Sequence, residues 1–406
     1  DAAIETLRKD IEDPAFIKGL ARSLLLENQH RVTVTLQPDV NLAREKADAE
    51  RARLQMTAQA MSDSERRYVM DQTAALALRQ TEVEDLEILP KVTLKDVPKD
   101  HPYPEPIVTG PVTAYGAGCN GIVYHQLIRE LPVLNEADWR LLPVLNQIAG
   151  ELGFGRQDYL DVQNLQQSLT GGISAFASVR ASLANTGQAG AFFVLSSRSL
   201  ARNASKMMTL LNETSQGLRF DETARIAELV RQSNTRKQMG VINQGHSLAM
   251  LAASAAFSKI SALNHQLSGL GSLAYFKALV AKIADGNVAS LAADLAELYA
   301  RFQQAPQSAM VIADEAKVPE LVNALLQRGT LTQSGPAQQL ILAEQTTLET
   351  AYVTETEVNF CAAAYACPSE SSAAVASVQV LAAVLRNQYL HAEIREKGGA
   401  YGGGAS

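Results

Sequence analysis

Apolar residues recur at seven-residue intervals in two consecutive series within residues 39–98, a region crowded with charged residues and free of glycine. The two series are Ala47, Leu54 and Met61, followed by Val69, Leu76 and Val83. Between them, Ser62 and Glu65 form the Ser-x-x-Glu capping box that starts a new helix. We therefore predict a helical hairpin whose helices meet through Leu54, Met61, Val69 and Leu76, with few contacts to the following domain. On its pattern alone this hairpin is an ordinary coiled-coil arm with a solvated charged face.

The segment before the hairpin carries signals for one helix and one strand. Residues 13–26 have a helical pattern, and the β-branched run at 32–36 predicts a strand that ends before Pro38. We expect residues 1–38 to be the end of a preceding α/β domain.

Residues 99–303 show strand patterns first and helical patterns afterwards. Strands are predicted at 108–115, 121–131, 172–181 and 191–196. Between 173 and 179 the apolar positions alternate, as in a sheet that is covered on one face. Helices are predicted at 135–153, 200–217, 221–239, 247–257 and 258–267. This order predicts an α+β domain, with an antiparallel-rich sheet packed on helices, rather than a wound parallel sheet.

The pattern starts again at residue 304. A strand at 309–313, a helix at 318–328, a strand at 357–365 and a long helix at 369–396 follow one another. We expect residues 304–406 to be the start of a further α+β domain that is truncated.

Composition excludes several classes of partner. The 406 residues carry a net charge of −7, and 47% of them are hydrophobic. A chain of this charge lacks the basic face that binding to nucleic acid or to an anionic membrane requires. No apolar run approaches the roughly 18 residues that span a bilayer. The three cysteines, Cys119, Cys361 and Cys367, are too few and odd in number for a disulfide framework. We expect a soluble protein in a reducing compartment, either the cytoplasm or a mitochondrial or plastid matrix.

The C-terminal segment combines a fixed cation and a phenol on a glycine-rich backbone. Arg395 ends the long predicted helix, Gly398 and Gly399 follow, and Tyr401 comes next. A guanidinium and a phenol can stabilise a developing oxyanion or hold peptide carbonyl groups. The segment lacks the Gly-Lys-Ser/Thr ending of a phosphate loop and follows a helix rather than a strand. Without further information, a mobile chain end would be the simpler interpretation.

The residues from 395 to 402 read Arg-Glu-Lys-Gly-Gly-Ala-Tyr-Gly. This stretch resembles the substrate-clamping segment of the pitrilysin/insulysin family of zinc metalloproteases, in its presequence protease branch. The resemblance implies that Arg395 and Tyr401 serve in catalysis and substrate binding, and that Gly398 and Gly399 let a peptide backbone lie close. It also implies metallohydrolase-type domains and a hairpin that links two halves of the enzyme.

Two shorter marks support the resemblance. The Gly245-His246 pair matches a Gly-His that opens a helix in this branch, and Asn120-Gly121 matches the start of a strand. We interpret His246 as a capping or packing residue rather than a metal ligand.

The family's zinc signature, His-x-x-Glu-His, is absent from this chain. None of the six histidines has another histidine four residues away; they are His30, His101, His125, His246, His265 and His391. Since the chain also begins at Asp1, we expect a fragment or a processed part of a larger protease.

The resemblance therefore implies the C-terminal portion of a metalloendopeptidase that degrades short unstructured peptides in an enclosed chamber. Zinc would be held by the N-terminal half of the same protein, and this fragment would bind none. The partners would be peptide substrates and that half, with no nucleic acid and no membrane. The alternative is a non-catalytic companion subunit of the same fold that binds peptides.

Overall fold

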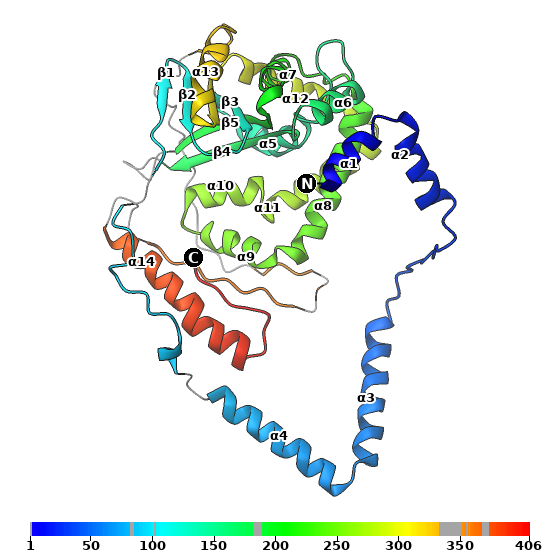
Figure 1. Ribbon diagram of the computed structural model, residues 1–406. Coiled ribbons are helices and arrows are strands. Elements are labelled where there is room, and N and C mark those ends of the chain that lie inside the picture. Colours follow the sequence, from blue (N-terminus) through cyan, green and yellow to red (C-terminus); the bar gives the residue numbers. More distant parts are fainter. Residues whose placement is uncertain are drawn as a thin grey trace. The chain divides into compact units, whose positions relative to one another are not determined.

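The computed structural model in Figure 1 describes residues 2–81, 85–100, 103–181, 189–332, 351–354, 356, 358–367 and 373–406. The chain divides into two compact units, Asp1–Lys91 and Val92–Ser406. Each unit is described by itself.

The first unit is helical in its described residues. Its elements are α1 (Ala2–Asp10), α2 (Pro14–Ala21), the π-helical η1 (Arg22–Leu26), α3 (Leu42–Ala60), α4 (Asp63–Thr81) and the 3₁₀ turn η2 (Leu86–Ile88). Helix α2 starts at Asp13, whose carboxylate accepts a hydrogen bond from the Ala15 N–H at 2.9 Å. The helix predicted at 13–26 is therefore confirmed, with a π-helical last part.

The strand predicted at 32–36 is wrong. These residues form no regular structure, and Val32, Val34 and Leu36 are exposed. A β-branched run becomes a strand only when a neighbouring strand and a packed face stabilise it, and the described part of this unit has no strand to pair with it.

The capping box between α3 and α4 is confirmed. The Glu65 N–H donates to Ser62 Oγ at 3.3 Å, and the Ser62 N–H donates to Glu65 Oε2 at 2.8 Å. The bond from the Ser62 backbone, followed by the one from its hydroxyl, lowers the pKa of Glu65. Helices α3 and α4 therefore occupy the two segments predicted to be helical, and no strand interrupts them.

The predicted apolar contact between the two helices is wrong, although the Arg66 guanidinium of α4 donates to the Ala58 carbonyl of α3 at 2.6 Å. Leu54, Val69 and Leu76 are 53%, 50% and 60% exposed, and neither helix buries a residue. The reason is that each series supplies one apolar position per heptad, whereas a coiled-coil seam needs two. Val83 lies outside the described residues.

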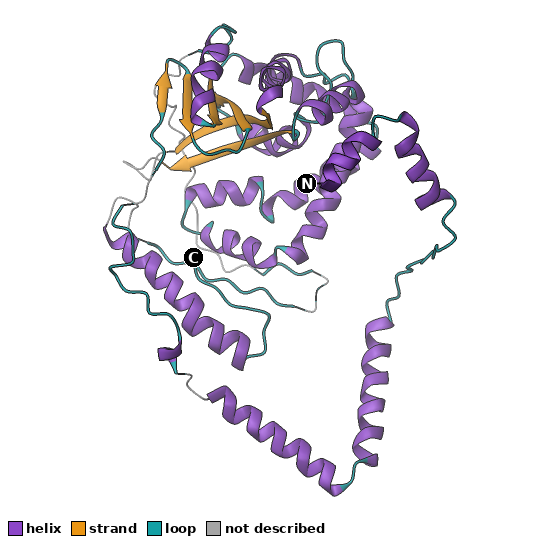
Figure 2. Cartoon of the chain, viewed as in Figure 1, coloured by secondary structure: helices purple, strands orange, loops and turns teal. Residues whose placement is uncertain are grey.

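The second unit is built on a mixed six-stranded sheet. Its strands are β1 (Ile107–Thr109), β2 (Val112–Gly116), β3 (Ile122–Glu130), β4 (Ile173–Ala181), β5 (Ala189–Leu200) and β6 (Gln307–Ala313). The order is β1-β2-β6-β3-β5-β4; β2 and β6 run parallel, and the other neighbours are antiparallel. The predicted α+β class is confirmed (Figure 2). A turn at Gly110, which has φ +56°, splits the single strand predicted at 108–115 into β1 and β2.

Strand β6 corrects the expected domain boundary at residue 303. It lies inside the sheet between β2 and β3, and the helix that follows it, α13 (Val318–Leu326), buries Val318, Leu321, Val322 and Leu325 against β2 and β6. Residues 307–326 therefore complete this domain instead of opening another one. A local pattern could not reveal this, because more than 100 residues separate β6 from its neighbours β2 and β3.

Helices cover the sheet on one face, and the strands alternate accordingly. The remaining helices are α5 (Glu136–Ile148), α6 (Tyr159–Leu169), the 3₁₀ turn η3 (Ala201–Asn203), α7 (Ala204–Gly217), α8 (Thr223–Asn243), α9 (Gly245–Ser254), α10 (Lys259–Leu267), α11 (Gly271–Ala284), α12 (Val288–Gln303) and the 3₁₀ turn η4 (Glu315–Lys317). In β6, Ala309 and Val311 are buried while Met310 and Ile312 are partly exposed. Helices α5, α7, α12 and α13 pack on the sheet, and the buried residues form one core cluster.

One stretch, Lys259–Ala284, is long and apolar enough to cross a membrane by length and composition. The structure breaks it at residues 268–270 into α10 and α11. Phe276, Leu279 and Ile283 of α11 are buried in the core cluster, so these helices help to build the domain's core.

The last part of the chain contains one long helix. It consists of α14 (Ala373–Val384), continued as the π-helical η5 (Leu385–Lys397). The helix predicted at 369–396 is confirmed from residue 373, because residues 369–372 are outside the described range. The strand predicted at 357–365 is wrong in its described part, since residues 358–365 have no regular structure.

A buried arginine closes one end of the sheet. Arg129 on β3 is 5% exposed, and its guanidinium donates to the carbonyl oxygens of Gln303 and Ala305, both at 3.0 Å, at the end of α12. It also donates to Ser215 Oγ at 3.3 Å, and this hydroxyl donates to Gln307 Oε1 at 2.6 Å. Burial lowers the pKa of Arg129. One side chain thus joins β3, the end of α7, the end of α12 and the start of β6.

We predict that Arg129→Met destabilises the protein by about 3–5 kcal/mol, because it leaves buried carbonyl groups without a donor. Arg198→Met on β5 is the matched control; this exposed side chain should contribute less than about 0.5 kcal/mol. Urea unfolding followed by circular dichroism measures both. Equal urea midpoints for Arg129→Met and Arg198→Met would contradict the stabilising role of Arg129.

Candidate functional site

The candidate Arg/Tyr segment forms the end of the long C-terminal helix. The Gly399 N–H donates to the Arg395 carbonyl at 3.2 Å, and the Ala400 N–H donates to the Ile394 carbonyl at 3.1 Å. Gly399 has φ +69°, the left-handed conformation that ends many helices. The chain therefore turns back at this point, and Gly403 reaches the side chain of Ile394.

Arg395 and Tyr401 are both presented to solvent. Arg395 lies in the last turn of the helix, and Tyr401 follows the turn with 90% of its side chain exposed. Neither side chain forms a hydrogen bond or ion pair with any residue that the structure describes. The neighbouring Lys397 differs, since its ammonium donates to Glu393 Oε1 at 2.7 Å, which raises the pKa of Lys397. Arg395 and Tyr401 are thus available to bind something outside the chain.

Gly398 and Gly399 have a structural reason to be glycine. A Cβ at Gly398 would lie 2.6 Å from the Ile394 carbonyl oxygen, and Gly399 has the positive φ. These glycines therefore position Tyr401 after the helix, whether or not a peptide backbone also approaches them.

The histidines lie apart from one another in the described chain. His125 is buried on β3, and burial, with a smaller contribution from Arg328, lowers its pKa to about 3. His265 shares a hydrogen bond of 3.1 Å with the hydroxyl of Tyr352. His391 lies 3.1 Å from Glu396 Oε1. Among the described residues, no group of three His, Cys, Asp or Glu side chains is arranged to hold a metal ion. His101 is outside this range.

The Gly-His pair does open a helix, as predicted. Helix α9 begins at Gly245, which is buried, and a Cβ there would lie 2.3 Å from the Phe360 ring. His246 itself is exposed, and Gln244 occupies the cap position. The expected capping or packing role of His246 is therefore wrong, and the glycine carries the structural constraint.

Sequence reasoning missed the residue that explains Asn120-Gly121. The Asp314 carboxylate accepts hydrogen bonds from the N–H groups of Cys119 at 2.7 Å, Asn120 at 3.1 Å and Gly121 at 2.8 Å. These bonds, with that from Gly121 the strongest, lower the pKa of Asp314. Asn120 and Gly121 both have positive φ, +57° and +78°. Asp314 thus fixes the turn before β3, although its sequence offers no signal of this distant partner.

A comparison with protein-family models matches residues 36–279 to the family described as peptidase M16 (subfamily C) associated. This match includes α3, α4 and the domain up to α11.

Comparisons with whole proteins find similarity to presequence proteases. The chain is 24% identical over 426 residues to the mitochondrial presequence protease of Danio rerio, covering 97% of this chain and 41% of that protein. It is 24% identical over 414 residues to presequence protease 1, chloroplastic/mitochondrial, of Arabidopsis thaliana, covering 99% of this chain and 38% of that protein. Among solved structures, a peptidase M16 inactive domain from Pseudomonas fluorescens has a TM-score of 0.37 and 17% identity, over 60% of this chain and 54% of the other. The chain therefore spans about two fifths of the length of the presequence proteases it matches.

We predict that Gly399→Ala loosens the end of the C-terminal helix, because alanine in the left-handed conformation costs about 1 kcal/mol. Gly402→Ala is the matched control, since nothing lies within 4 Å of a Cβ there. Amide hydrogen exchange of residues 395–400 measures the effect; faster exchange is expected only in Gly399→Ala. Unchanged exchange protection in Gly399→Ala would show that the left-handed conformation at residue 399 does not stabilise the end of the helix.

Proposed function

The chain belongs to the family associated with subfamily C of the M16 peptidases, and from this we propose that it is the C-terminal portion of a zinc-dependent peptidase. That peptidase would degrade short unstructured peptides in an enclosed chamber. The likeness to presequence proteases over nearly the whole chain carries the proposal.

In this proposal Arg395 and Tyr401 clamp the peptide. The guanidinium would hold peptide carbonyl groups, and the phenol would donate to the carbonyl oxygen that gains negative charge during hydrolysis. Their exposure and the fixed turn at Gly399 support these roles. Gly398 and Gly399 would leave room for the peptide backbone.

Zinc does not fit the described residues of this chain, which contain no group of side chains suited to hold it. The metal would be held by another part of the longer protein, and we assign no step at the metal to residues described here.

Exposed apolar residues on the first unit and on the C-terminal helix support the proposal that this chain is part of a larger molecule. Leu25 and Leu26 of η1 are exposed, as are Val380 and Leu381 of α14. Exposed apolar residues in such groups are typical of surfaces that another part of a protein covers. Residues 1–38 would end a preceding domain, α3 and α4 would link two halves, and the chain after α13 would begin the next domain.

Location and partners follow from the same relatives. Their names place them in mitochondria or chloroplasts, so an organelle matrix is the proposed compartment for this protein. Its partners would be peptides and the zinc-binding half. A non-catalytic companion subunit of the same fold is the alternative, and a zinc signature in the remainder of the longer protein would distinguish the two.

In the full-length protein, Tyr401→Phe should lower kcat about 10²–10³-fold with little change in KM, because one donor to the developing charge is lost. Arg395→Ala should also raise KM, since a cationic clamp holds the substrate before the reaction. Tyr389→Phe and Arg386→Ala are matched controls, because both side chains are exposed earlier on the same helix.

Steady-state kinetics on an unstructured peptide measures these effects, with thermal melting as the folding control. If Tyr401→Phe keeps wild-type kcat while folded, the catalytic assignment is wrong and the segment is a mobile tail.

A further inference from the structure

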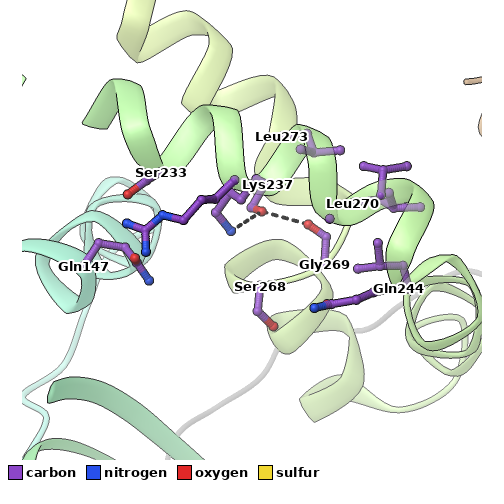
Figure 3. A pocket seen from close by; sticks show the side chains of 13 residues that line it. Gln147, Ser233, Lys237, Gln244, Ser268, Gly269, Leu270 and Leu273 are labelled. Atoms are coloured by element: carbon purple, nitrogen blue, oxygen red, sulfur yellow. Dashed lines mark hydrogen bonds between the residues drawn. The ribbon is translucent and has the colours of Figure 1, made fainter. Parts of the chain in front are cut away.

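A small cavity lies between α8, α11 and the turn at residues 268–270 (Figure 3). Its volume is about 220 Å³. Ligand sites for larger organic molecules usually measure about 300–1,000 Å³, so this cavity suits a small group. None of its lining residues is acidic, although the chain as a whole carries a net charge of −7.

Lys237 brings a cation into the cavity. Its ammonium is partly buried, donates to Ser272 Oγ at 3.0 Å and lies 4.8 Å from the centre of the Phe276 ring. The Ser272 hydroxyl in turn donates to the Gly269 carbonyl at 2.8 Å. Burial lowers the pKa of Lys237, and no carboxylate in the described chain forms an ion pair with it. A buried ammonium without a counter-ion is unfavourable, and a bound anion would relieve this cost.

Two further lining residues point to an anion. Arg236, which is exposed, adds a second cation at the rim of the cavity, likewise without an ion pair among the described residues. Ser233 is 3% exposed, and its hydroxyl has no hydrogen-bond partner in the described structure. Buried hydroxyl groups are rarely left unpaired, so this one is free to donate to a ligand.

The cavity also faces the start of a helix. Residues 269, 270, 272 and 273 line it, and α11 begins at Gly271 with no acidic residue in its first turn. The N–H groups of Ser272 and Leu273 donate to the carbonyls of Gly269 and Leu270, both at 3.1 Å, so this 14-residue helix would attract negative charge through its dipole rather than through free N–H groups at these two residues. The neighbouring cavity of about 430 Å³ shares Arg236 with this one, but its lining also includes Glu151, which disfavours an anion there.

We propose that this cavity binds a single oxyanion group, either a carboxylate or a phosphate, through Lys237, Arg236 and the Ser233 hydroxyl. This site is independent of the Arg395 and Tyr401 clamp. A carboxylate would come from an acidic side chain or a peptide C-terminus, whereas a phosphate would come from solution.

Isothermal titration of the 406-residue chain with N-acetylglutamate and, separately, with inorganic phosphate tests the proposal. N-acetylglutaminamide, in which amides replace both carboxylates at nearly the same shape, is the neutral control. The variants are Lys237→Met, which keeps the length of the side chain beside Phe276, and Arg231→Gln, which removes an exposed cation from the same helix. Thermal melting shows whether each variant is folded.

We expect one equivalent of N-acetylglutamate or phosphate to bind, about tenfold more weakly to folded Lys237→Met and unchanged to Arg231→Gln. Tighter binding of N-acetylglutamate identifies a carboxylate site, and tighter binding of inorganic phosphate identifies a phosphate site. Absence of saturable binding by both probes up to about 10 mM would overturn the proposal. Equal binding of the neutral N-acetylglutaminamide would also overturn it, as would equal losses of binding in the two variants.

Discussion

A buried guanidinium without a carboxylate must be solvated by other oxygen atoms, and the Nη1 group of Arg129 meets this requirement with carbonyl groups at the end of α12. These oxygens carry the negative end of the helix dipole, which suits a cation. Through Ser215 the same side chain reaches Gln307 at the start of β6. Because these segments lie far from Arg129 in sequence, 86 residues away for Ser215 and 176 for Ala305, the interaction requires the complete domain and fixes where β6 enters the sheet.

The position of β6 determines the geometry at its other end. Asp314 follows the strand directly and binds three backbone N–H groups of the turn before β3. The helices between β5 and β6 include α8 and α11, whose packing creates the cavity around Lys237. The sheet, the Asp314 turn and the cavity therefore all depend on the insertion of β6 between β2 and β3, which joins residues far apart in sequence.

Local signals predicted much of this fold and only part of its sites. Asn135 and the Ser62–Glu65 pair marked helix starts because a cap is decided within three residues. The place of β6 and the absence of a strand at 32–36 depend on distant partners. The predicted apolar seam between α3 and α4 fails for a local reason, because each helix offers one apolar position per heptad. Arg395 and its glycines were visible as a helix end, whereas Lys237 looks in sequence like any helical surface lysine. Its partial burial depends on α11, which supplies Ser272 and the Phe276 ring.

The central claim is that this chain supplies a peptide clamp to a peptidase whose zinc site lies elsewhere. Cleavage of one unstructured peptide, followed by mass spectrometry, should be compared between this chain and the longer protein in zinc-containing buffer. We predict chelator-sensitive cleavage by the longer protein and none by this chain. Chelator-sensitive cleavage by the 406-residue chain alone, or no cleavage by the folded longer protein, would contradict the account.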